Sequence, residues 1–172
     1  MRNKLPLFTA ALCLCGLLAS CGAPAELPDS ETLFSRPFRM TASCVAGETA
    51  SSFEFEYLSA DSGSLTFIEP AAVCGMALTR EGAVVREDFL GITSEREFSS
   101  LPRSNPLAAL FSLAAATRLD GAAASASTSG HSYELPDGSS LLAVSGVPRV
   151  IELASAGLTI TVTSFEYLDE SN

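Results

Sequence analysis

The sequence predicts a mainly β protein with some helix: a curved antiparallel sheet of about nine strands, forming an incomplete barrel, with one helix covering its concave face. Apolar and polar residues alternate with a period of two through most of the chain after residue 34, which is typical of half-buried strands. Glycine, proline and aspartate separate these runs at short intervals. Only one stretch has helical spacing. One helix covers only part of so wide a sheet, so the sheet must curl around it.

The first strands alternate clearly over residues 38–44 and 53–57. The loop Asp61-Ser62-Gly63 then predicts a three-residue hairpin turn, with Gly63 in the left-handed conformation that glycine adopts easily. This register places Tyr57 opposite Phe67. The aromatic side chains would then share one face of the sheet.

A second hairpin is expected at Glu81-Gly82, and a two-residue turn there places Leu78 opposite Val85. The same register places Cys74 opposite Phe89. Five strands in sequence order, joined by short turns, predict a meander.

A helix is predicted to begin at Asn105-Pro106, because asparagine is a good cap and proline suits the first turn. Its apolar residues fall on one stripe. Arg118 and Gly121 suit its end. The stripe comprises Leu107, Leu110, Phe111 and Ala114.

Residues 121–130, GAAASASTSG, are of low complexity and are expected to form a flexible linker. Strands resume at Tyr133. Ile151 and Leu153 are expected to pair across Ala156-Gly157 with Ile160 and Val162, and the last strand is expected to run to about Tyr167.

The N-terminus has the features of an export signal. Arg2 and Lys4 precede an apolar stretch from Leu5 to Leu18, shorter than the ~20 apolar residues of a membrane-spanning helix. The stretch ends in Leu-Ala-Ser-Cys at residues 18–21, which resembles the bacterial lipobox. The resemblance implies cleavage before Cys21 and attachment of diacylglycerol to its thiol, with further acylation by a chain such as palmitate.

These features predict the organisation of the chain: a signal peptide at 1–20, a flexible tether at 21–33 and one domain at 34–168. Two or three acyl chains on Cys21 give stable anchoring. We therefore expect an extracytoplasmic protein anchored by lipid to the cell membrane, or to the outer membrane if the cell has two. The membrane is its first expected partner.

Charge excludes one class of function. After removal of residues 1–20, eight arginines and no lysine face twenty acidic residues, a formal net charge of −12. A nucleic-acid binder needs a basic surface, so we expect no nucleic-acid partner.

The sequence offers little for catalysis. His131 is the one histidine and lies beside the expected linker, where an exposed loop residue is the ordinary interpretation. Glu54 and Glu56 share a strand face and are expected to be solvated. There is no nucleophile elbow and no clustered metal ligands. We expect a protein that is not an enzyme and that carries no metal and no cofactor.

Cys44 and Cys74 are the two cysteines left beside Cys21 in the exported chain. A disulfide is possible, because exported proteins can form them. The expected strand order separates the two by three strand spacings, ~14 Å, whereas a disulfide needs Cα atoms within ~7 Å. Two buried free thiols are therefore favoured.

The order of features resembles the LolA/LolB-like fold, a curved incomplete barrel closed on its open side by helix. The resemblance rests on the strand end from Phe67 to Pro70, the Glu81-Gly82 turn, and Gly146-Val147-Pro148 leading into the terminal hairpin. It implies binding of acyl chains or lipoproteins, or a role as an envelope sensor or partner. This chain departs from the family in having only one clear helix.

Two functions follow from these expectations. The first is binding of an apolar ligand, such as a lipid or a lipoprotein acyl chain, on an aromatic and aliphatic face under the helix. The second is an envelope interaction or regulatory module whose interior is packed and holds no ligand. The candidate ligand residues, for which plain core packing is the alternative, are Phe53, Phe55, Tyr57, Phe67, Leu107, Leu110 and Phe111.

Overall fold

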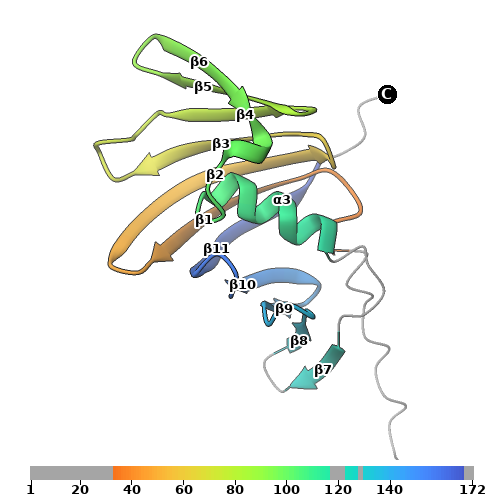
Figure 1. Ribbon diagram of the computed structural model, residues 1–172. Coiled ribbons are helices and arrows are strands. Elements are labelled where there is room, and N and C mark those ends of the chain that lie inside the picture. The colour runs from red at the N-terminus through yellow and green to blue at the C-terminus, as the bar shows by residue number, and fades with distance from the viewer. Residues whose placement is uncertain (1–32, 117–122, 128–129, 169–172) are drawn as a thin grey trace, which may run out of the picture.

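A computed structural model describes residues 33–116, 123–127 and 130–168. They form one antiparallel sheet of eleven strands with a helix lying across one face, as Figure 1 shows. The first half of the sheet contains β1 (Phe38–Ala46), β2 (Thr49–Ser59), β3 (Ser62–Glu69), β4 (Ala77–Glu81), β5 (Val84–Phe89) and β6 (Ile92–Glu97). A 3-10 turn, η1 (Phe98–Ser100), and the helix α3 (Pro106–Ala116) follow. The second half contains β7 (Ala123–Ser127), β8 (Gly130–Glu134), β9 (Ser140–Val144), β10 (Val147–Leu153) and β11 (Leu158–Tyr167).

The two halves are meanders that meet in the middle of the sheet. The strand order is β6-β5-β4-β3-β2-β1-β11-β10-β9-β8-β7, so the first and last strands are neighbours. Their pairing runs from Phe38 opposite Tyr167 to Ala46 opposite Leu158. The sheet therefore has two free edges, β6 and β7, and does not close into a barrel.

The predicted fold class is confirmed. Two strands beyond the expected nine were not predicted, and the reason is the same for both. Every residue of β6 is exposed, so no apolar alternation marks it. β7 consists of alanine and serine within the stretch that was expected to be a flexible linker. That expectation is wrong for residues 123–127, whereas residues 121–122 and 128–129 lie outside the described part of the chain.

The predicted register of the β2–β3 hairpin is wrong. Tyr57 lies opposite Gly63 and Phe53 opposite Phe67. Gly63 is a strand residue rather than a turn residue, and a Cβ there would lie 2.4 Å from the carbonyl oxygen of Glu56 and 3.0 Å from the ring of Phe111. The error is an even number of residues, so the aromatic residues still share one face.

The β4–β5 hairpin turns one residue later than predicted. Glu81 pairs with Val84, and Leu78 lies opposite Glu87 rather than Val85. Gly82 is the first turn residue and has φ of +61°, a left-handed conformation that this kind of turn requires and that glycine adopts easily. The expected pairing of β10 with β11 is confirmed, but its register differs. Ile151 lies opposite Ile160 and Leu153 opposite Leu158, so the strands separate before the predicted two-residue turn and Val162 is not opposite Ile151.

The helix begins where the sequence predicts. The side-chain oxygen of Asn105 accepts a hydrogen bond from the backbone N–H of Leu107 at 3.0 Å. The expectation of a single apolar side is wrong, because Ala108, Ala109 and Leu113 are also buried. A helix that is apolar on nearly all sides must be covered on several sides. The expected end at Arg118 and Gly121 lies outside the described residues.

The packed domain includes the last residue of the expected tether. Leu33 is 1% exposed and belongs to the core. The remainder of the signal peptide and tether, with Cys21, lies outside the described residues, and those assignments stay predictions. No helix in the described part of the chain is long and apolar enough to cross a membrane.

Candidate functional site

The face predicted to hold a ligand is filled by its own side chains. All seven residues are at most 9% exposed. Phe111 of α3 packs edge-on against Phe55 of β2, with ring centroids 5.7 Å apart, and lies 5.6 Å from Tyr57. Phe53 and Phe67 form another edge contact at 6.5 Å. The structure thus brings the predicted residues together, in the arrangement of a packed core.

Arg80 is a central residue of this interface that the sequence did not indicate. Its guanidinium lies 3.8 Å from the ring centroid of Phe98 and 4.5 Å from that of Phe111. Its Nε donates to the carbonyl of Gly82 at 3.0 Å, and it forms an ion pair with Asp61 at 3.3 Å. Burial lowers the pKa of Arg80, because the charged form loses contact with water. The side chain joins η1 and α3 to the sheet.

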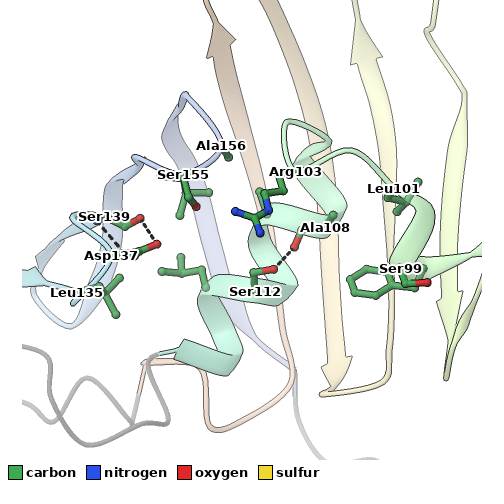
Figure 2. A pocket seen from close by; sticks show the side chains of 14 residues that line it. Ser99, Leu101, Arg103, Ala108, Ser112, Leu135, Asp137, Ser139, Ser155 and Ala156 are labelled. Carbon is green, nitrogen blue, oxygen red and sulfur yellow. Dashed lines mark hydrogen bonds between the residues drawn. The ribbon is translucent and has the colours of Figure 1, made fainter.

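The hollow beside the helix lies on its other flank. A cleft of about 360 Å³ lies between α3, the segment 98–103, the β8–β9 turn and the β10–β11 turn. Figure 2 shows the side chains that line it. Its apolar lining is Phe98, Leu101, Ala108, Ala109, Leu113, Leu135, Leu153 and Ala156. Its polar lining is Ser99, Arg103, Ser112, Asp137, Ser139 and Ser155.

One side of the cleft is held by a short chain of hydrogen bonds. The carboxylate of Asp137 accepts from the backbone N–H and from the hydroxyl of Ser139, both at 3.0 Å. The oxygen of that hydroxyl accepts in turn from the backbone N–H of Ala154 at 3.2 Å, which links the two turns. The backbone N–H of Ser139 is the main reason why the pKa of Asp137 lies below its ordinary value of 3.8.

The cleft has the chemistry of a small amphipathic binding site. Leucine and alanine side chains supply much of the apolar surface, and Arg103 and Asp137 add one positive and one negative group to the lining. The lining contains four serines but no histidine, cysteine or lysine. The sequence did not indicate this cleft, because its residues come from loops and helix positions far apart in the chain.

The two cysteines are both free, but only one is buried. Cys44 of β1 is buried, and burial raises the pKa of its thiol. Cys74 is exposed in the turn before β4, so the expectation of two buried thiols is wrong for this residue. Residues 71–75 form turns and β4 begins only at Ala77, which leaves Cys74 outside the strand.

The other titratable residues form no site within the described ranges. No group of three or more histidine, cysteine or acidic residues there could hold a metal. Glu54 and Glu56 lie beside Arg39 on the outer face, with Glu56 at 2.6 Å from it. His131 is a half-buried residue of β8 rather than the loop residue expected.

Comparisons with known proteins concern the fold. No protein-family model matches the chain, and no curated protein matches its sequence. An uncharacterised conserved protein from Thermus thermophilus is similar in structure with a TM-score of 0.50 and 13% identity, over 83% of this chain and 85% of that chain. That similarity supports the open sheet with its helix as a recurring fold.

Two further structures are similar at lower scores. The LolA superfamily protein NE2245 from Nitrosomonas europaea has a TM-score of 0.44 and 10% identity, over 84% of this chain and 96% of that chain. A chain in the structure of the CwlD amidase from Clostridioides difficile in complex with the GerS lipoprotein has a TM-score of 0.37 and 9% identity, over 100% and 98% of the two chains.

Proposed function

We propose that this chain is a non-catalytic lipoprotein, held outside the cytoplasm by lipid on Cys21, that acts as an interaction module for another protein of the cell envelope. The observation that supports a module of this kind is the filled concave face. The residues that would have lined a lipid cavity are buried and belong to one hydrophobic core, in which Phe111 of α3 packs against Phe55, Tyr57 and Arg80. A protein with a packed interior works through its surface.

The anchor and the binding function are tested separately. We expect the wild-type protein to incorporate a palmitate analogue in its own cells and Cys21→Ala to incorporate none. Equal labelling of the two would contradict the anchor.

The interaction is tested with a photo-crosslinking amino acid at three exposed positions. Val45 and Ile68 are exposed residues of β1 and β3, and Ser94 lies on the edge strand β6. We expect the lipidated protein to form a covalent adduct with a defined envelope protein from at least one position. Adducts with lipid alone would contradict an interaction module.

The cleft beside α3 supports a second candidate, the binding of a small amphipathic molecule such as a short acyl chain. Its volume of about 360 Å³ lies within the usual range of ligand pockets, and Arg103 could pair with an anionic head group. Native mass spectrometry of a form that begins at Gly22 separates the candidates. The interaction module predicts the mass of the polypeptide alone, and the second candidate predicts a bound molecule that is lost when Leu113→Trp fills the cleft.

A further inference from the structure

Three features of the edge strand β6 indicate the kind of partner that it could bind: its free backbone groups, an apolar row that ends at it, and the charge of its outer face. It is the last strand of the sheet on one side and pairs only with β5. All six of its residues are exposed. Figure 1 shows the β5–β6 hairpin at the end of the sheet remote from β7.

The first feature is a free row of backbone groups. Phe89 and Ile92 flank a two-residue turn and form a hydrogen-bonded pair position, so positions alternate from there along the strand. Thr93 and Glu95 therefore occupy the positions whose N–H and C=O groups point away from β5. No other strand in the described part of the chain pairs with them. Such an edge can accept a further strand.

The second feature is an apolar row that runs out to this edge. The register places Phe53, Phe67, Met76, Phe89 and Ile92 side by side across successive strands on the inner face. Their exposure rises from 0% at Phe53 and 9% at Phe67 to 73% at Ile92, because α3 covers only the central strands. An apolar side chain placed beside Ile92 would extend the row.

The turn adds an exposed apolar residue in an unusual conformation. Leu90 has φ of 51° and Gly91 has φ of 80°, as in a type I′ turn. Asparagine or glycine is the ordinary residue at the position of Leu90, which is 84% exposed. A leucine at this position is unfavourable for the backbone and leaves an apolar side chain in water. Contact with a partner would account for both features.

The third feature is the charge of the outer face. Glu81, Glu95 and Glu97 are exposed there, and Asp88 pairs with Arg86 at 2.8 Å. A hollow of about 520 Å³ on this face is lined by Glu81, Arg86, Asp88 and Glu95 together with Thr79 and Val84. Basic side chains would complement this surface. A second copy of β6 would bring its own Glu95 and Glu97 to it, so charge disfavours self-pairing.

We propose that β6 accepts an extended segment of another envelope protein as a twelfth strand, and that this segment alternates apolar with basic residues. The apolar residues would lie beside Ile92 on the inner face, and the lysines or arginines beside Glu95 and Glu97 on the outer face. This inference rests on the proposed interaction function and names the surface and the kind of partner.

The test uses the full lipidated protein in detergent micelles and fluorescent eight-residue peptides. One peptide alternates valine and lysine, and its matched control alternates valine and glutamate. We expect the valine–lysine peptide to bind at least tenfold more tightly, with an affinity that falls as salt rises. Equal affinity for the two peptides would overturn the proposal.

Two variants of Glu95 separate charge from backbone pairing. Glu95→Gln removes the charge only. Glu95→Pro also removes the outward N–H, while the pairing with β5 does not use that group. We expect Glu95→Pro to weaken binding at least tenfold beyond Glu95→Gln, at an unchanged urea midpoint. Equal binding by the two variants, at equal midpoints, would overturn strand addition.

Leu90→Asn tests the turn, because asparagine suits its conformation. We expect this variant to keep the urea midpoint and to bind the peptide at least threefold more weakly. Unchanged peptide binding together with lost binding to phosphatidylcholine vesicles would instead indicate a membrane contact, and dimerisation that Glu95→Pro abolishes would indicate a second copy. Both results would overturn the proposal.

Photo-crosslinking at Ser94 distinguishes failure of this inference from failure of the proposed function. If Glu95→Pro leaves the Ser94 adduct intact, or if adducts form only from Val45 and Ile68, the interaction function stands and the role of β6 fails. If no position gives a protein adduct, the interaction function itself fails.

Discussion

Replacement of Arg80 by methionine tests how the helix is held to the sheet. Methionine keeps the length and the apolar stem of the side chain but removes the charge and its hydrogen bonds. The side chain of Arg80 is 13% exposed and lies between two aromatic rings, so the charge acts in a poorly hydrated place. The variant reports on the cation rather than on volume.

The expected magnitude follows from the contacts. Each ring contact is worth about 1 kcal/mol in a partly desolvated position. The hydrogen bond from the charged group to the carbonyl of Gly82 adds about 1.5 kcal/mol. The ion pair adds little, because Asp61 is 75% exposed. Relief of the desolvation that lowers the pKa of Arg80 offsets part of this sum, so we expect Arg80→Met to destabilise the fold by about 2 kcal/mol.

The measurement is urea denaturation of the form beginning at Gly22, at neutral pH. With a slope of about 2 kcal/mol/M, the expected loss moves the midpoint down by about 1 M. Arg86→Met on the neighbouring strand is the matched control. Arg86 is 57% exposed and pairs with Asp88 on the outer face, so its replacement should leave the urea midpoint nearly unchanged.

Equal midpoints for Arg80→Met and Arg86→Met would refute this reasoning. Such a result would mean that the rings of η1 and α3 hold their places by packing alone. A change in slope without a change in midpoint would indicate altered compactness rather than lost contacts.

Three further outcomes are expected. Gly63→Ala should destabilise the fold by about 1–3 kcal/mol in the same assay, because its Cβ would lie 2.4 Å from the carbonyl oxygen of Glu56; full stability would contradict the close approach. In the native form beginning at Gly22, a thiol reagent should add to Cys74 within minutes and to Cys44 only after unfolding, and mass spectrometry showing two additions to folded protein would contradict the burial of Cys44. The pKa of Asp137 is lowered in the folded state, so the stabilisation from its charged form is present above pH 3.8 and is lost as the pH falls through the folded pKa. The difference in free energy of unfolding between wild type and Asp137→Asn should therefore shrink below pH 4. A difference that grows below pH 4 would contradict the lowered pKa.

Most of the sheet could be predicted because its strands carry their own signal. The alternation of Phe53, Phe55 and Tyr57 fixes which side faces the core, and an error of an even number of residues in the hairpin register leaves that side unchanged. All residues of β6 are exposed and β7 consists of alanine and serine, so no apolar alternation in their sequence marks them as strands. Their place in the sheet depends on the neighbouring strand.

The candidate site was harder to predict for a different reason. Arg80 lies in a strand, where a cation ordinarily faces solvent, and its partners Phe98 and Phe111 come from later segments. The cleft depends likewise on turns around Asp137 and Ala156 that meet α3 only in three dimensions. Local pattern indicates which residues are apolar, whereas the shape of a hollow depends on how distant segments pack.

The pairing of β1 with β11 has a consequence for how such a chain matures. The seam at the centre of the sheet joins residues 38–46 to residues 158–167, so the core cannot close until nearly the whole polypeptide has been delivered. A chain threaded through a membrane from its N-terminus would stay open, and therefore transportable, until its final strand emerged. In a chain with this architecture, the central seam can form only once the last strand is available.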